Sequence, residues 1–413
     1  MSLTVARADK GVSGGVWAVL AAAGALAVTM MGTTLPTPLY GLYEHRFGFG
    51  GLMATIVYAT YAVGVIAALL LFGQWSDQIG RRPLLLGAIV LSALSAVMFL
   101  VTGGLPLMFA GRVLSGLSAG VVTGTATAAI IELAPPEHRR HAPLVATVAN
   151  MGGLGCGPLL AGILAQYAPE PLRTPFTVHL VLLAAAGLVV LLLPETARAS
   201  GPVRLRPQPL RVPREMRGTF VSAAIAGFAG FATLGLFTSV SASFMSQILG
   251  VRSAALSGLV VFVLFAASTI GQVGTGRVPA DRALPAGCAV LIVGMALIAA
   301  SLLLTSLVLL LVGAVVTGAG QGMGFRAAIT TVSEHSPPQR RAEITSTLFV
   351  ALYVGISIPV VGVGACAQML GLRTAGVIFA AFVALLALFA AVRVARPTEA
   401  PAAPRSGPDQ REQ

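Results

Sequence analysis

Long stretches without a single Asp, Glu, Lys or Arg are the feature that most constrains this chain. Residues 47–76 and 83–111 are two such runs, with a short polar turn between them. Each run exceeds the about 20 apolar residues that an α-helix needs to cross a bilayer. Charged residues make up only 10% of the chain, against about 25% in soluble domains. The sequence therefore predicts an integral membrane protein with many spans and excludes a water-soluble fold.

The runs predict twelve transmembrane helices. Run 283–325 is too long for one span, so we expect a turn at Thr305 and Ser306 and a helix that continues past Arg326. Run 83–111 should turn near residues 103–106, and its tail then joins run 113–131 in one span. Backbone in lipid must satisfy its own hydrogen bonds, and the strands of a barrel would not show such long apolar runs, so the spans are helices. The charge-free runs are 11–43, 47–76, 83–111, 113–131, 142–169, 174–194, 218–251, 253–276, 283–325, 344–372 and 374–392.

A segment rich in Arg and Pro divides the spans into two groups of six. We expect residues 1–194 to form an N-terminal half and 218–393 a C-terminal half. Residues 195–217 would be an extended cytoplasmic linker, and residues 394–413 a disordered cytoplasmic tail. The first apolar run is too long for a signal peptide, so we expect an uncleaved first span.

The two groups also share sequence. Segment 132–139 recurs as segment 334–341, at an offset of 202 residues that also aligns Gly116 with Gly318. An internal repeat in a helical membrane protein is typical of transporters, in which the binding site lies near the midplane between the repeats. We therefore predict an all-α membrane protein of two pseudo-symmetric six-helix halves.

The basic residues set the orientation in the membrane. If both termini lie in the cytoplasm, twenty of the 26 basic residues are cytoplasmic and four are external, as the positive-inside rule requires. The net charge of +12 then follows from topology, and no nucleic-acid partner is expected. Lys10 is the one lysine among many arginines, which indicates a GC-rich genome. We expect a multi-pass protein of a bacterial cytoplasmic membrane.

The turn after the second span carries the most specific motif. Its spacing resembles the signature G-x-L-a-D-r-x-G-r-k, found between the second and third helices of transporters of the major facilitator superfamily; Trp75 and Gln78 depart from it. From this turn we expect Asp77 and Arg81 to latch the halves in the outward-facing state. The alternative is an ordinary cytoplasmic loop with one stray acid. The implied conformational switch consists of Gly73, Asp77, Gly80, Arg81 and Arg82, with Glu132 as a partner for Arg81.

Two further stretches resemble signatures of this superfamily. In the fourth span, the stretch that begins at Arg112 resembles the signature R-x-x-q-G-x-g, with Ser115 in place of the glutamine. An arginine within a span normally faces a cavity or a partner, although Arg112 could instead snorkel to the outer surface. The fifth span resembles the signature G-x-x-x-G-P-x-x-G-G of drug–proton antiporters, except at Ala161. Its small residues would form a helix seam between the halves, or a plain packing seam. The matching residues are Gly153, Gly157, Pro158 and Gly162.

The polar residues inside the spans are candidates for the cavity and for coupling to an ion. We assign Arg112, Arg326, Gln321 and Asn150 to this group. None of the acidic residues falls near the middle of a span, and arginine keeps its charge in proteins. A cavity of this kind would repel cations, so we expect neutral or anionic apolar substrates, unless both arginines are structural. Proton coupling would then use a group near a span end, with Asp77, Glu132, Glu44 and His179 as candidates.

Motifs of other functional classes are absent from the sequence. There is no phosphate-binding G-x-x-x-x-G-K, no hydrolase elbow and no histidine pair with metal-ligand spacing, so we expect no enzyme, cofactor or metal. Cys156, Cys288 and Cys366 fall within apolar runs and should be buried.

Together, the resemblances imply a secondary active transporter that works by alternating access. The closest functional class is a proton-coupled, multidrug-type efflux antiporter, a monomer whose partners are a small apolar molecule, protons and the lipid bilayer. An importer of a small metabolite is the alternative within transport. A non-transporting membrane sensor with this fold is a third possibility, which should carry an added soluble domain.

Overall fold

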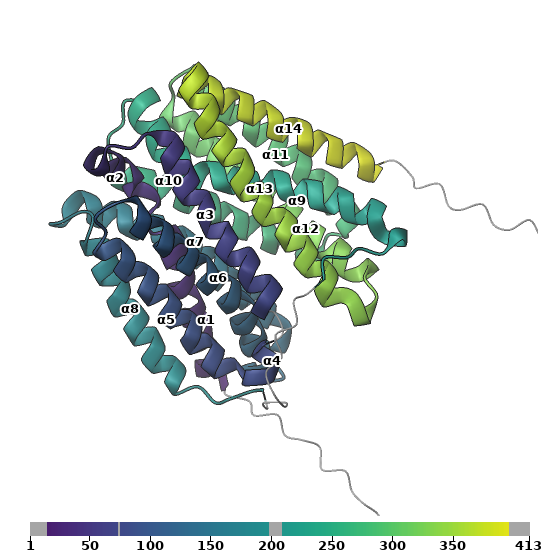
Figure 1. Cartoon of the computed structure of the whole chain (residues 1–413). Coiled ribbons are helices and arrows are strands. Elements are labelled where there is room, and N and C mark those ends of the chain that lie inside the picture. The colour runs from purple at the N-terminus through teal and green to yellow at the C-terminus, as the bar shows by residue number, and fades with distance from the viewer. Residues whose placement is uncertain (1–14, 73–74, 198–208, 396–413) are drawn as a thin grey trace, which may run out of the picture.

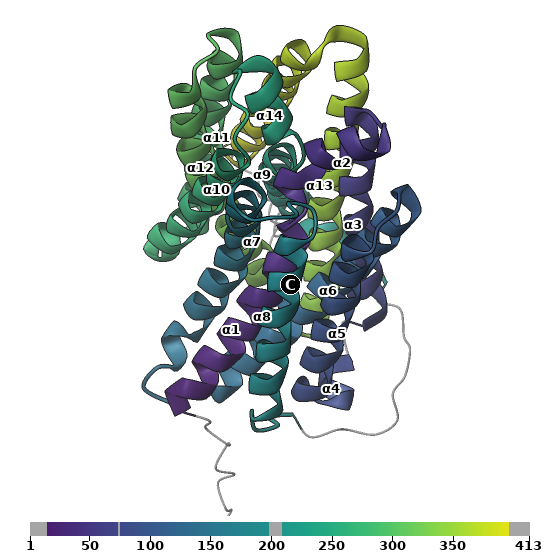
Figure 2. The same cartoon turned by 90° about the vertical axis from the view of Figure 1, so that its left-hand side faces the viewer.

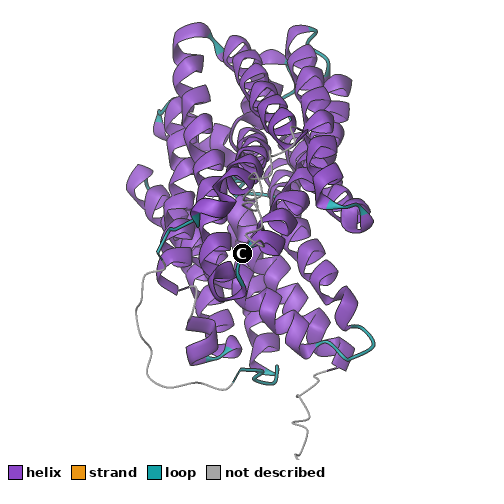
Figure 3. Ribbon diagram, turned by 90° about the vertical axis from the view of Figure 1, so that its right-hand side faces the viewer, coloured by secondary structure: helices purple, strands orange, loops and turns teal. Residues whose placement is uncertain are grey.

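The computed structural model describes residues 15–72, 75–197 and 209–395, and every regular element within them is a helix (Figure 3). Twelve helical segments in this part of the chain are long and apolar enough to cross a membrane. The long helices are α1 (Gly15–Thr34), α3 (Gly51–Phe72), α5 (Arg81–Leu100), α6 (Leu105–Leu133), α7 (Ala142–Tyr167), α8 (Thr174–Leu191), α9 (Arg217–Ser243), α10 (Ala254–Gly274), α11 (Ala280–Leu303), α12 (Leu307–His335), α13 (Arg341–Leu370) and α14 (Leu372–Ala395). Two short helices, α2 (Tyr40–Phe47) and α4 (Trp75–Ile79), lie at opposite ends of the bundle (Figure 1).

The helix boundaries follow local chemistry. The expected turn at Thr305 and Ser306 is confirmed: Thr305 has a left-handed φ of 50°, and the Ser306 hydroxyl accepts a hydrogen bond from the backbone N–H of Leu309 at the start of α12. Run 83–111 also turns as expected, between α5 and α6. The first run is interrupted rather than continuous, because Pro36 and Pro38 end α1 and a 3₁₀ turn at Thr37–Leu39 leads into α2.

The internal repeat is visible in the packing of the glycines. A Cβ atom at Gly116 on α6 would overlap the carbonyl oxygen of Tyr61 on α3. At the equivalent place in the second half, a Cβ at Gly318 on α12 would overlap the carbonyl oxygen of Leu264 on α10. The aligned glycines therefore bring equivalent pairs of helices into backbone contact. This confirms the prediction of two pseudo-symmetric halves, α1–α8 and α9–α14.

In the described part of the chain, the two halves contact each other toward the middle of the bundle and at one of its ends. We call this end the α2 end, and the opposite end, with Leu133 and His335, the α4 end. At the α2 end, Gly162 on α7 packs on the backbone of Ala254 on α10, and Gly364 on α13 packs on Thr55 on α3. Away from α2 the halves splay apart, one toward the bottom of Figure 1 and the other toward the right. Figure 2 shows the bundle from the left-hand side of Figure 1, with helices of the N-terminal half such as α1 and α8 running downward.

A polar contact closes the α2 end further. The Oε1 atom of Gln166, at the end of α7, accepts hydrogen bonds from the Ser253 hydroxyl at 2.6 Å and the backbone N–H of Ala255 at 3.1 Å. One half thus caps the first turn of a helix that belongs to the other. Large apolar side chains such as Val63, Leu188 and Leu385 point outward, which suits contact with lipid.

Candidate functional site

A cavity lies on the axis between the two halves. Eight helices contribute to its lining, α1, α3, α6 and α7 from the N-terminal half and α9, α10, α12 and α13 from the C-terminal half. Its volume is about 80 Å³, enough for a few water molecules but below the range of about 300–1,000 Å³ typical of ligand pockets. A ligand therefore needs side chains to rotate or the halves to move. The lining residues are Met30, Thr33, Thr34, Tyr58, Tyr61, Ala119, Thr123, Asn150, Met151, Leu154, Phe231, Leu234, Thr238, Phe265, Phe325, Phe349, Tyr353 and Ile356.

The two walls of this cavity differ in chemistry. The N-terminal half contributes most of the hydroxyl groups, from threonines of α1 and α6 and tyrosines of α3, together with the amide of Asn150. The C-terminal half contributes four phenylalanines and Tyr353, and all of these rings except that of Phe265 pack against one another. None of the lining residues that the structure describes is an Asp, Glu, Lys, Arg or His. We call these two surfaces the polar wall and the aromatic wall.

Arg112 lies directly behind the polar wall. Its side chain is fully buried, and Nη1 donates a hydrogen bond of 2.6 Å to the carbonyl oxygen of Thr33. Its guanidinium carbon lies 5.3 Å from the ring centre of Tyr58, 5.5 Å from that of Tyr61 and 5.6 Å from that of Tyr40. Ring faces stabilise a cation at such distances. Arg112 therefore does not snorkel to the surface but places a positive charge one ring behind the cavity.

The other three candidates for the cavity separate in space. Asn150 lines it, and its Oδ1 atom is buried without a hydrogen-bond partner among the described residues. Gln321 is buried outside the lining, where its Oε1 atom accepts a hydrogen bond from Ser268 at 2.5 Å. The prediction that Arg326 belongs to the cavity is wrong. Its side chain is exposed and borders a separate hollow at the α4 end, beside Gly276. Five residues beyond Gln321 is about 1.4 helical turns, so Arg326 faces a different direction.

The predicted seam in α7 has two faces. A Cβ atom at Gly153 or Gly157 would overlap carbonyl oxygens of α1, which belongs to the same half. Gly162 faces the backbone of α10 in the other half, and the carbonyl group of Pro158 is where Gly258 of α10 packs. The expectation that Gly157 lies on a seam between the halves is therefore wrong, because successive residues of a helix point about 100° apart and Gly157 faces α1. Pro158 and Gly162 lie at the junction between halves, and Gly153 and Gly157 do not.

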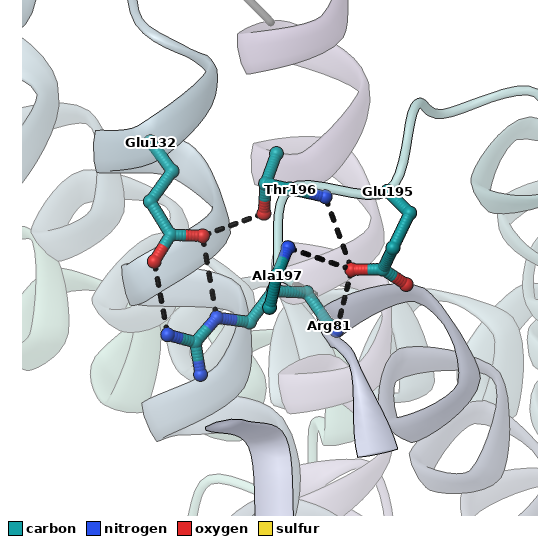
Figure 4. Close-up of polar contacts among 5 residues, drawn as sticks. All are labelled: Arg81, Glu132, Glu195, Thr196 and Ala197. Carbon is teal, nitrogen blue, oxygen red and sulfur yellow. Dashed lines mark hydrogen bonds and ion pairs between the residues drawn. The ribbon is translucent and has the colours of Figure 1, made fainter. Parts of the chain in front are cut away.

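A second polar site lies at the α4 end, on the predicted switch (Figure 4). The guanidinium group of Arg81 contacts the carboxylate of Glu132 through two hydrogen bonds, Nη2 to Oε1 at 2.9 Å and Nε to Oε2 at 3.3 Å. The expected pairing is thereby confirmed. Both residues belong to the N-terminal half, so this ion pair joins α5 to α6 and does not cross to the other half.

Glu195 and Thr196 complete this cluster, in a role that was not predicted from the sequence. The carboxylate of Glu195 accepts hydrogen bonds from the backbone N–H groups of Arg81 at 2.8 Å and Arg82 at 3.0 Å, at the start of α5. An acid is stabilised at a helix N-terminus by exposed N–H groups and by the helix dipole. The Thr196 hydroxyl donates to Glu132 at 2.5 Å. The sequence offered one signal for this role, which is that the acidic residue Glu195 directly follows Pro194 after the end of α8.

Gly80 is required in this cluster on two counts. Its φ of 111° is one that residues with a side chain rarely adopt, and a Cβ atom there would lie 2.7 Å from a Glu195 carboxylate oxygen. Gly73 lies outside the described residues. The structure describes the backbone of Asp77 in α4 but not its side chain, so the latch expected of its carboxylate stays a prediction.

Comparison with known proteins decides the family. The profile of the Major Facilitator Superfamily matches residues 22–300 and 280–412. The chain belongs to the major facilitator superfamily. The expected membership of this superfamily is thereby confirmed.

Among its relatives in the superfamily are drug-resistance proteins. The class D tetracycline resistance protein of Salmonella ordonez is 30% identical over 136 residues, 33% of this chain and 33% of that protein. The quinolone resistance protein NorA of Staphylococcus aureus is 24% identical over 182 residues, 43% of this chain and 46% of that protein. The alignments thus span about a third to a half of the length of these relatives.

Solved structures of the superfamily share the whole architecture. A bacterial homologue of the human lysosomal transporter Spinster, in an inward-facing and unoccupied conformation, superposes with a TM-score of 0.71 over 92% of this chain and 96% of its own, at 17% identity. A D-xylose–proton symporter superposes with a TM-score of 0.71 over 90% of this chain and 96% of its own, at 14% identity. Identities this low establish the fold alone.

Proposed function

We propose that this superfamily member is a secondary active transporter that exports small, largely apolar molecules by alternating access. The observation that carries the proposal is the cavity between halves that meet at the α2 end and diverge at the α4 end. In such a transporter the halves rock about a fixed central site. Relatives named for tetracycline and quinolone resistance favour export over import.

The arginine distribution assigns the α4 end to the cytoplasm of a bacterial cell, with both termini on that side. With this orientation the structure represents the inward-facing state, in which substrate enters from the cytoplasm. Contacts such as Gln166 with Ser253 would hold the external side shut. Rocking would then break these contacts and bring the α4 ends together.

The cluster around Arg81 would act as the conformational switch. It ties the start of α5 to the end of α6 and to the residues that follow α8, so the N-terminal half moves as one body. We propose that Asp77, beside this cluster in sequence, contacts the C-terminal half once the α4 end closes. The proton would bind outside the cavity lining, with Glu44, Glu132 and the buried His179 as the candidates whose side chains are described.

Accumulation of a fluorescent apolar dye tests the function. Cells that express the protein should retain less dye than cells without it, and an uncoupler that dissipates the proton gradient should abolish the difference. Lower dye in expressing cells regardless of the uncoupler would contradict proton coupling. Higher dye in expressing cells would contradict export and favour an importer.

A further inference from the structure

We propose that the central cavity selects planar aromatic molecules that are neutral or anionic, holds their polar edge against α1, α3, α6 and α7, and discriminates against organic cations. This inference rests on the proposed function, because it names the cargo of the same cavity. Three observations carry it: the two unlike walls, the charge of Arg112 behind one of them, and the Oδ1 atom of Asn150, which has no partner among the described residues.

The unlike walls orient a bound molecule. Phe231, Phe325 and Phe349 form a continuous group on the aromatic wall, with ring centres 5.4 Å and 6.2 Å apart in succession. A flat ring system packs well against such a surface, because aromatic pairs favour offset and edge-to-face contacts. The opposite wall offers Thr123 and Asn150, and polar groups of the ligand lose least hydration when they face it.

Asn150 is the group on the polar wall with hydrogen-bonding capacity to spare. The hydroxyls of Thr33 and Thr123 donate to backbone carbonyls of their own helices, and that of Thr34 to the carbonyl of Leu154. The amide of Asn150 has a buried Oδ1 atom without a partner in the described part of the chain. Leaving such an acceptor unpaired is unfavourable, so a ligand with an N–H donor, such as a carboxamide, gains by donating a hydrogen bond to this oxygen.

The charge of Arg112 decides which ligand charge the cavity accepts. Tyr58 and Tyr61 line the cavity with the guanidinium group behind them, 5.3 Å and 5.5 Å from their ring centres. A ligand charge on the near side of these rings would lie about 10 Å from the guanidinium, which at an effective dielectric constant of about 20 disfavours a cation by about tenfold relative to a neutral molecule. None of the described lining residues supplies a carboxylate to offset this.

The aromatic rings do not reverse this preference. Ring faces attract cations, but the rings of Tyr58 and Tyr61 already stack over Arg112. On the aromatic wall, the ring of Phe231 is tilted by 46° against that of Phe325 and stands at 80° to that of Tyr353. These contacts cover part of the ring faces that a cation would need.

Equilibrium binding to the purified full-length protein in lipid nanodiscs tests the inference. Three probes share one ring system and differ in charge: naphthalene carboxamide, naphthalene carboxylate and (naphthylmethyl)trimethylammonium. We expect the ammonium probe to bind about tenfold more weakly than the carboxamide, and the carboxylate at least as tightly. Arg112→Gln should bring the three dissociation constants together. Arg326→Gln removes the same charge from an exposed site and should leave them apart.

A second variant keeps the test decisive if Arg112→Gln does not fold. Asn150→Leu should weaken binding of the carboxamide by about fivefold, the effect of one lost hydrogen bond, and barely change binding of the ammonium probe. Ammonium binding as tight as that of the carboxamide, or no binding by any probe, would overturn the inference. Convergence of the three constants in Arg326→Gln would also overturn it. Binding in the expected order without transport would refute the proposed function and leave this inference standing.

Discussion

Gly258 offers a direct way to shift the balance between the two states. A Cβ atom at this position of α10 would overlap the carbonyl oxygen of Pro158 on α7, and it would lie 2.8 Å from the carbonyl carbon and 3.1 Å from the Cα atom of Leu159. The obstacle is backbone, which cannot rotate away as a side chain can. Gly258→Ala should therefore push α7 and α10 apart and destabilise the state in which the α2 end is closed.

The magnitude follows from measured effects of overpacking, which are about 1–3 kcal/mol. In the proposed outward-facing state α7 and α10 are separated at this end, so the cost falls on the inward-facing state alone. The ratio of outward- to inward-facing molecules should then rise by roughly five- to a hundred-fold, since each 1.4 kcal/mol is about a factor of ten. Such a change would be visible as a new population.

Electron–electron distance measurements can detect this population. Spin labels at Tyr167 and Arg252 would report on the opening, because both residues are exposed and they lie next to this junction on opposite halves. We expect Gly258→Ala to add a component at longer distance. Gly274→Ala is the matched control on the same helix, since no neighbouring atom lies within 4 Å of its new Cβ.

Gly157→Ala separates this effect from general damage. Its Cβ would collide with Met31 on α1 within the same half, so it should lower thermal stability without changing the distance distribution. If Gly258→Ala folds normally and its distribution matches that of the wild type, the junction of α7 and α10 does not control the opening. An equal shift in Gly157→Ala would refute the reasoning as well.

Further predictions concern the switch and the topology. Arg81→Gln should lower the free energy of unfolding by about 1 kcal/mol, because the side chains of Arg81 and Glu132 are 12% and 35% exposed. Dye export should fall by more than the loss of folded protein explains. A loss of export in proportion to the loss of folded protein would argue against a switch. Asp77→Asn should reduce export at unchanged expression, as measured by dye efflux and immunoblotting, and near-normal export would contradict the latch. In a chain without its native cysteines, Leu210→Cys should react with an impermeant maleimide only in inverted vesicles and Glu170→Cys only in intact cells; reaction of Leu210→Cys in intact cells would reverse the orientation.

The amino-acid sequence alone determined the number, type and approximate bounds of the spans. The apolar core of a bilayer disfavours charged side chains, so long charge-free runs indicate spanning helices without knowledge of their neighbours. The turn at Thr305 and Ser306 could be placed because the run there was too long for one span. The pairing of Arg81 with Glu132 could be expected because one begins the third span and the other ends the fourth, at the same end of adjacent spans.

Which face of each helix meets which neighbour was decided only by the tertiary structure. Arg112 and Arg326 looked alike as single arginines in apolar spans, yet one is fully buried behind the cavity and the other is exposed. Glu195 reaches its partner Arg81 across 114 residues, and no local pattern records that approach. In a soluble protein the apolar stripe of a helix indicates its buried side. Lipid is as apolar as the protein interior, so these spans are apolar all round and their sequences leave the rotation of each helix open.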